Sequence, residues 1–115
     1  MTIVREVMTH NPIVATIPSS RIDVLRMMVR HNLTGAPVVK RDDDELVGMI
    51  TRRDIFDNPE EDQLALVMKR DPQYLDPETP VEEAARVMIQ TKETHLPVVE
   101  DGKLVGIMTP TDLLY

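Results

Sequence analysis

One block of nine residues occurs twice in this chain. Residues 46–54 read Leu-Val-Gly-Met-Ile-Thr-Arg-Arg-Asp, and residues 104–112 read Leu-Val-Gly-Ile-Met-Thr-Pro-Thr-Asp. A second pair lies upstream, where residues 36–39 read Ala-Pro-Val-Val and residues 96–99 read Leu-Pro-Val-Val. The chain is therefore a duplicated unit, and its fold has to accommodate the same local structure twice.

The length of the chain limits how the two copies fold. The 115 residues suffice for a compact domain, but each half has too few residues to bury a self-sufficient core without disulfides or a metal. There are no cysteines, so no disulfide framework exists. We predict two motifs, residues 1–57 and 64–115, joined by an acidic linker over residues 58–63 and sharing one core.

Charge and hydropathy exclude several classes of function. The net charge is -7 and the sequence has no basic stretch, which argues against nucleic-acid or membrane-surface binding. The longest apolar runs, such as residues 64–68, are too short to cross a bilayer, and no signal-peptide pattern opens the chain. We expect a cytoplasmic protein without membrane insertion. The sequence stops soon after Pro110 begins a last helix, which indicates either a piece of a longer protein or a small module.

Apolar spacing predicts the same order of elements in both halves. In the first half we expect a short helix over residues 2–8, an extended segment over 13–17, a helix from the N-cap Ser20 to Asn32, strands over 36–40 and 45–50, and a helix over 52–56. Residues 41–45, Arg-Asp-Asp-Asp-Glu, are most simply a solvated hairpin tip, since no calcium-loop spacing is present.

The second half repeats this order with different turn chemistry. Residues 64–68 repeat the first short helix. Thr79 is predicted to cap a helix in which Pro80 occupies the first turn and Glu82 completes a capping box. Strands are expected over residues 96–100 and 103–108, connected by the hairpin pair Asp101-Gly102.

The repeated Thr-x-x-Asp sequence allows two interpretations. A Thr after a strand with an Asp three residues later, at a helix start, can bind a nucleotide: the carboxylate accepts hydrogen bonds from ribose hydroxyls, and the helix N-terminus attracts phosphate. The same spacing is also an ordinary N-capping arrangement. Because both copies keep the same context, we favour the nucleotide interpretation.

Taken twice, the order of helix, Pro, strand, helix, Pro-Val-Val strand, Leu-Val-Gly strand and Thr-x-x-Asp helix resembles a tandem pair of CBS domains, the Bateman module. The resemblance covers essentially the whole chain. It implies an α/β fold of two pseudo-twofold-related motifs, each a short sheet with flanking helices, and two clefts between the motifs. It also implies binding of AMP, ADP, ATP or S-adenosylmethionine, regulation of an attached or partner enzyme or transporter, and homodimers formed through helical faces.

The resemblance also assigns residues to the two clefts. In the family, each cleft combines the early strand and Pro-Val-Val region of one copy with the Thr-x-x-Asp box of the other. The first site would then use Thr9, Ile13, Leu33, Thr34, Ala36, Ile107, Thr109, Thr111 and Asp112. The second would use Lys69, Gln73, Glu93, Thr94, Leu96, Met49, Thr51, Arg53 and Asp54. The Asp residues would take ribose hydroxyls and the apolar strand residues would hold adenine.

The two predicted sites differ in charge. Arg52, Arg53, Lys69 and Arg70 flank the Asp54 site, which we expect to bind charged nucleotides more tightly, although Glu93 opposes this. The alternative is that these cations are simply solvated surface.

Catalysis and metal binding find no support in the sequence. No nucleophile–base constellation is visible, and the three histidines show no metal-ligand spacing. His95 could face a cleft. We therefore expect no enzyme, no cofactor and no metal. The alternative to ligand sensing is a structural dimerisation module with degenerate pockets.

Overall fold

The computed structural model describes residues 1–114, and the chain has a mixed α/β fold, as predicted. The chain forms two compact units. Residues 13–72 form one, here called the central unit. Residues 1–12 together with residues 73 onward form the other, here called the terminal unit. These units cut across the predicted motifs, because the first twelve residues pack with the second repeat; the motif boundaries at 57 and 64 stay a prediction.

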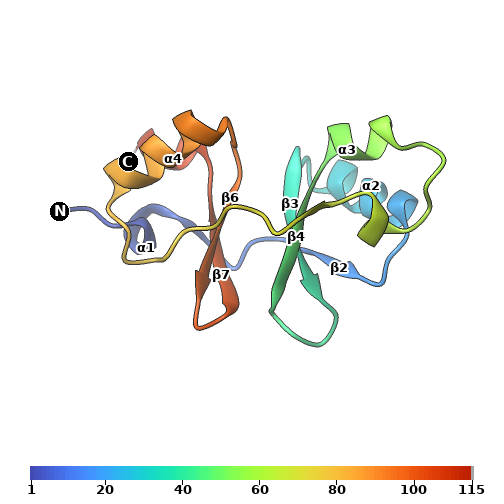
Figure 1. The fold of residues 1–115 in the computed structure, drawn as a ribbon, viewed down its shortest axis with the longest axis horizontal. Helices are drawn as coiled ribbons and strands as arrows, with labels where there is room; N and C mark the ends of the chain where they lie inside the picture. The colour runs from blue at the N-terminus through green and yellow to red at the C-terminus, as the bar shows by residue number, and fades with distance from the viewer. Residues whose placement is uncertain (115) are drawn as a thin grey trace. The chain divides into compact units, whose positions relative to one another are not determined.

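The central unit has a four-stranded sheet in the order β2-β3-β4-β5, in which β2 and β3 are parallel and the other pairs antiparallel. Its elements are β2 (Ala15–Ile17), α2 (Arg21–Arg30), β3 (Gly35–Lys40), β4 (Leu46–Thr51), α3 (Arg52–Asp57), the 3-10 helix η1 (Leu64–Leu66) and β5 (Lys69–Arg70). Figure 1 labels β2, α2, β3, β4 and α3.

Helix α2 begins where the sequence predicted. The hydroxyl of Ser20 accepts a hydrogen bond from the backbone N–H of Asp23 at 3.1 Å, which is the expected N-cap. Val24 and Met28, four residues apart, turn one face of the helix into the core. There they meet buried residues of the strands, including Val38 and Ile50, in one hydrophobic cluster.

The terminal unit has a three-stranded sheet in the order β1-β7-β6. Its elements are α1 (Val4–Val7), β1 (Thr9–His10), α4 (Val81–Thr91), β6 (Leu96–Glu100), β7 (Lys103–Met108) and the 3-10 helix η2 (Pro110–Leu114). A second hydrophobic cluster, with Val4, Met88, Leu96 and Met108 among its members, lies entirely within this unit. Each unit thus has its own buried cluster; one core common to both repeats stays a prediction.

Each repeat lends its leading segment to the other. Strand β1 lies near the start of the first repeat but pairs with β7 of the second, Thr9 opposite Ile107. Strand β5 lies near the start of the second repeat but pairs with β4 of the first, Lys69 opposite Met49. The leading segments 1–12 and 64–70 are therefore exchanged between the repeats, and neither repeat completes its own sheet.

The repeated glycine allows these exchanged segments to approach closely. A Cβ atom on Gly48 would lie 2.7 Å from both the carbonyl oxygen of Lys69 and the sulfur of Met68. A Cβ on Gly106 would lie 2.5 Å from the sulfur of Met8. Only glycine leaves room at these positions, which explains why the Leu-Val-Gly sequence occurs in both copies.

The predicted elements are present with three differences. Residues 64–66 and the segment from Pro110 form 3-10 helices rather than α-helical turns. Thr79 was predicted to cap α4, but the N-cap is Pro80 and no side chain caps this helix. The carbonyl of Thr2 accepts the hydrogen bond of Val81 N–H at 3.0 Å, so the exchanged segment satisfies a donor that a capping side chain would otherwise serve. Tyr115 lies outside the described residues.

Candidate functional site

The Thr51–Asp54 box lies where β4 passes into α3. The hydroxyl of Thr51 accepts a hydrogen bond from Asp54 N–H at 3.2 Å, and Asp54 Oδ2 accepts one from Thr51 N–H at 3.0 Å. This is the reciprocal capping box that the spacing also allowed. The box uses one carboxylate oxygen. Asp54 is half-buried, and within residues 1–114 its Oδ1 accepts no hydrogen bond.

The Thr109–Asp112 box repeats this arrangement at the end of β7. Asp112 Oδ2 accepts hydrogen bonds from Thr109 N–H at 2.9 Å and from the Thr109 hydroxyl at 3.4 Å. The hydroxyl of Thr9, on the exchanged strand β1, donates to Asp112 Oδ1 at 3.4 Å. Both boxes therefore orient a half-buried carboxylate at the carboxyl end of a strand. Capping and ligand binding are compatible here, because capping occupies only Oδ2.

The predicted site residues divide between the units. The central unit contains Ile13, Leu33, Thr34, Ala36, Met49, Thr51, Arg53, Asp54 and Lys69. The terminal unit contains Thr9, Gln73, Glu93, Thr94, Leu96, Ile107, Thr109, Thr111 and Asp112. Each predicted set draws on both units, and the assembly of the two sets stays a prediction.

Within each unit, sheet pairing brings several of these residues together. Gly35 lies opposite Thr51 and Ala36 opposite Ile50, so the start of β3 adjoins the Thr51–Asp54 box. Similarly, Leu96 lies opposite Met108, beside the Thr109–Asp112 box. The side chains of Ala36 and Leu96 belong to the hydrophobic clusters, so they form part of the wall behind the boxes.

Met49 and Ile107 occupy the other face of their sheets. Both are buried, yet neither belongs to the hydrophobic clusters that contain their neighbours Ile50 and Met108. Successive side chains of a strand point to opposite faces, so Met49 and Ile107 point away from those clusters. Contact of these two residues with a bound adenine stays a prediction.

The structure assigns Arg52 a role that the sequence analysis missed. Arg52 Nε donates to the carbonyl of Leu33 at 2.6 Å, and its Nη2 donates to the carbonyl of Met28 at 3.4 Å. The guanidinium therefore ties the end of α2 and the following loop to α3. Because these bonds hold it in place, Arg52 serves the fold. Arg53, by contrast, is exposed and lies 3.7 Å from Asp57.

His95 adds a titratable group near the Thr109–Asp112 box, because its neighbour Leu96 lies opposite Met108. Burial lowers the pKa of its imidazole from the usual 6.5, while the negative charge of Glu93 acts in the opposite direction. Nδ1 of His95 and the hydroxyl of Thr94 are 3.0 Å apart, within hydrogen-bonding distance. Among residues 1–114, no group of three or more His, Asp and Glu side chains is placed to hold a metal ion.

Family comparison agrees with this architecture. The CBS domain profile matches the sequence twice, over residues 4–61 and 63–115. The chain belongs to the CBS domain family. The two matches and the two Thr-x-x-Asp boxes confirm the predicted tandem CBS pair.

Solved structures of other CBS pairs are closely similar in fold. CBSX2, from Arabidopsis thaliana and solved in complex with AMP, is 30% identical with a TM-score of 0.92, over 99% of this chain and 94% of that one. The CBS pair of protein MJ0100, in complex with 5′-methylthioadenosine and S-adenosyl-L-methionine, is 27% identical with a TM-score of 0.89, again over 99% and 94%.

Curated relatives are longer proteins. An inosine-5′-monophosphate dehydrogenase of Korarchaeum cryptofilum is 35% identical over 115 residues, which are 98% of this chain but 23% of the dehydrogenase. The chain spans 41% and 14% of two further relatives, uncharacterized protein MJ1225 of Methanocaldococcus jannaschii and the A-adding tRNA nucleotidyltransferase of Aquifex aeolicus. No helix within residues 1–114 has the length and hydrophobicity needed to traverse a bilayer.

Proposed function

We propose that this CBS pair is a regulatory module that binds an adenosine ligand (AMP, ADP, ATP or S-adenosylmethionine) and modulates an attached or partner protein. The repeated box is the observation that carries the proposal. In both units a half-buried carboxylate is oriented at a strand end, with Oδ2 in the capping box. Two hydroxyls of a ribose are natural donors to such a carboxylate.

The similar structures support the ligand class. CBSX2 was solved with AMP, and the MJ0100 pair with two adenosine-containing molecules. Occurrence of the same module within dehydrogenases fits a regulatory rather than a catalytic role for this chain. The regulated protein would be an enzyme or transporter, attached or separate.

Substitutions that keep the capping box test the role of the carboxylates. Asp54→Asn and Asp112→Asn retain an acceptor for the box but lose the charge that a ribose requires, and Asp57→Asn is a matched control on the exposed end of α3. Calorimetric titration with the four ligands should show tight binding to the wild type. Each box variant should lose about 1.5–3 kcal/mol of binding free energy at its own site, and Asp57→Asn should lose none.

Thermal unfolding gives an independent measurement. A ligand at one hundred times its dissociation constant stabilises a folded protein by about 2.7 kcal/mol. If none of the four ligands raises the melting temperature, or if the box variants bind as tightly as the wild type, the chain is not an adenosine sensor.

We also propose that the site at the Thr51–Asp54 box binds charged nucleotides more tightly than the other site, with fewer cations than the sequence suggested. Main-chain carbonyls hold Arg52, and Arg70 likewise donates to the carbonyl of Ala65 at 3.4 Å. The proposal therefore uses Arg53 and Lys69, which lie near the Thr51–Asp54 box in sequence or sheet register. Titrating Asp112→Asn with ATP and with adenosine tests it. Tighter binding of ATP is expected, and equal affinities would count against any polyphosphate preference.

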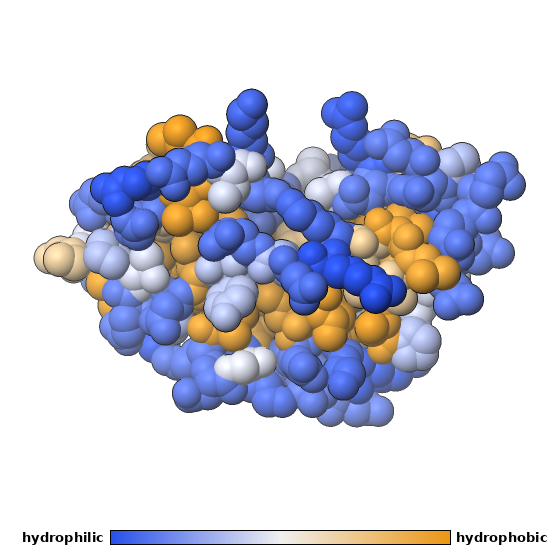
Figure 2. Space-filling model, viewed as in Figure 1, coloured by the Kyte–Doolittle hydropathy of each residue, from blue (hydrophilic) through white to orange (hydrophobic). Residues whose placement is uncertain are grey.

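Exposed apolar residues on the helices favour a second role, homodimerisation. Val29 of α2 is 60% exposed, Phe56 of α3 is 63% exposed and Ile89 of α4 is 78% exposed. Figure 2 shows patches of hydrophobic surface between hydrophilic residues. We propose that these helical faces form the dimer contact, alongside ligand binding or, with degenerate pockets, in place of it.

A further inference from the structure

A cavity of about 630 Å³ opens at the hairpin end of the central unit. It is lined by Ile17, Pro18, Lys40, Arg41, Asp42, Asp43 and Ala65. Because β3 runs from Gly35, opposite Thr51, to Lys40, the cavity and the Thr51–Asp54 box lie at opposite ends of the sheet. The cavity is therefore separate from the proposed adenosine site.

The terminal unit provides an internal comparison for this cavity. Leu64 N–H donates to the carbonyl of Ser19 at 3.0 Å, and Val4 N–H donates to the carbonyl of Thr79 at 2.8 Å. The two bonds connect residues that correspond at an offset of 60 positions. By the same offset, Ala65 beside the cavity corresponds to Arg5 in the terminal unit.

In the terminal unit an arginine occupies the corresponding place. Nη2 of Arg5 lies 2.5 Å from Glu100 Oε2 and 3.1 Å from Glu78 Oε1. One guanidinium thus fills the space between two carboxylates. The cavity of the central unit lies where its duplicate holds this ion cluster.

All three members of that cluster are replaced in the central unit. Ala65 stands for Arg5, which removes the filling side chain; Pro18 stands for Glu78; and Lys40 stands for Glu100. The next residue changes in the same direction, because Arg41 stands for Asp101. The wall of the cavity thereby changes from two carboxylates to two cations, and its floor becomes apolar.

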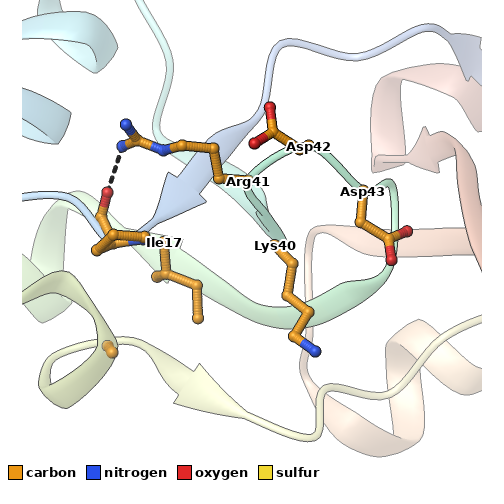
Figure 3. A pocket seen from close by; sticks show the side chains of 7 residues that line it. Ile17, Lys40, Arg41, Asp42 and Asp43 are labelled. Carbon is orange, nitrogen blue, oxygen red and sulfur yellow. Dashed lines mark hydrogen bonds between the residues drawn. The ribbon is translucent and has the colours of Figure 1, made fainter.

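The two cations are only lightly engaged. Lys40 Nζ lies 3.5 Å from Glu45 Oε2, and both side chains are at least half exposed, an arrangement that holds a lysine weakly. The guanidinium of Arg41 donates to the carbonyl of Pro18, which keeps it at the rim near Ile17 (Figure 3). Its remaining N–H groups stay available, since a guanidinium has five.

The acidic residues of the hairpin define the charge that the cavity can take. Asp43 Oδ1 accepts a hydrogen bond from Glu45 N–H at 3.1 Å, so its carboxylate helps to close the turn. Asp42 extends from the same loop, as Figure 3 shows. The formal charges of these two carboxylates and of Lys40 and Arg41 sum to zero. One added negative charge is therefore tolerated better than two, which favours a monoanion over a phosphate dianion.

We propose that this cavity binds a small organic monocarboxylate. Its apolar body would lie on Ile17, Pro18 and Ala65, and its carboxylate would accept hydrogen bonds from the guanidinium of Arg41. Lys40, which extends in another direction (Figure 3), would contribute positive charge to the wall. The volume is within the range of small-molecule sites. The proposal is independent of adenosine binding, because the two sites share no residue.

Titrations followed by amide NMR test this inference on the full chain. The probe is 3-methylbutanoate, and its neutral amide and inorganic phosphate are the comparison ligands. The carboxylate should shift the amide signals of Ile17, Arg41 and Ala65 in a saturable manner. The neutral amide, which lacks the charge, should bind about tenfold more weakly or worse.

A variant pair provides the control. Lys40→Glu with Ala65→Arg copies the Glu100–Arg5 pair into the central unit, so it should fill the cavity and abolish carboxylate binding while the spectrum remains folded. Arg30→Glu makes the same charge change as Lys40→Glu, on α2 and outside the cavity, and should leave binding unchanged.

Several results would overturn the inference. These are no saturable shift, equal affinity for acid and amide, tighter binding of phosphate, or undiminished binding by the double variant. Shifts confined to the Thr51–Asp54 box would also overturn it, and would point to the adenosine site instead. Loss of AMP binding alone would leave it intact.

Discussion

His95 shows how a single side chain can make the stability of one unit depend on pH. Burial lowers the pKa of its imidazole below the usual 6.5. The unfolded chain therefore takes up a proton at a higher pH than the folded chain does. This contribution to stability is complete above the usual pKa and is lost as the pH falls through that value toward the lower folded pKa.

Replacing this histidine should flatten the pH dependence. We expect the wild type to lose more unfolding free energy than His95→Asn between about pH 7 and pH 5, as measured by urea denaturation. His31→Asn, at an exposed position, serves as the control. Parallel stability profiles for the wild type and His95→Asn would contradict the assignment.

For single residues, the sequence indicated which side chains form the box, but it did not indicate all of the contacts that side chains make. The spacing of Thr51 and Asp54 predicted both a capping box and a ligand site, and the box is present. The role of Arg52 could not be predicted, because its partners are carbonyls of Met28 and Leu33, distant in sequence. Every residue has a backbone carbonyl, so the sequence does not indicate which of them accepts a hydrogen bond from a side chain.

Among the helices and strands, the exchange of the leading segments was the main feature that the sequence did not predict. Periodicity predicted almost every helix and strand, because burial of one face sets a local pattern. The two-residue strands β1 and β5 were missed, since so short a strand has no periodicity. Their partners were also unpredictable from pattern alone, because both repeats offer the same apolar edge.

The exchange predicts which sheet each segment stabilises. Leu64 and Val4 are both fully buried, Leu64 in the cluster of the central unit and Val4 in that of the terminal unit. Leu64→Ala should cost about 2–5 kcal/mol and Val4→Ala about 2 kcal/mol. Amide hydrogen exchange should show lost protection in β4 for Leu64→Ala and in β7 for Val4→Ala.

The opposite pattern would contradict the exchange. If Leu64→Ala loosened β7, the strand of its own repeat, each leading segment would stabilise the repeat to which it belongs in sequence. Ala65→Gly, next to Leu64 but with far less apolar surface to lose, is a suitable control for changes in backbone propensity.

For the whole molecule, dimerisation through the helical faces would bury exposed apolar side chains such as Ile89. Ile89→Glu places a charge where α4 exposes an apolar side chain, and should weaken the dimer about 30-fold, for a loss of about 2 kcal/mol. Light scattering should show the mass of one chain. Gln90→Glu, on the adjacent exposed position, adds the same charge and should leave the dimer intact. If light scattering shows that the wild type is a monomer, the proposed homodimerisation is wrong.

The division into units has a consequence for biosynthesis. Residues 13–72 form one uninterrupted stretch, whereas the terminal unit needs residues 1–12 and the stretch from residue 73. On the ribosome the central unit can fold as soon as its last strand emerges. Residues 1–12, which include the buried Val4 and Met8, must wait until β6 and β7 have been made. Synthesis therefore lets the central unit mature before the terminal unit, although residues 1–12 are made before the central unit.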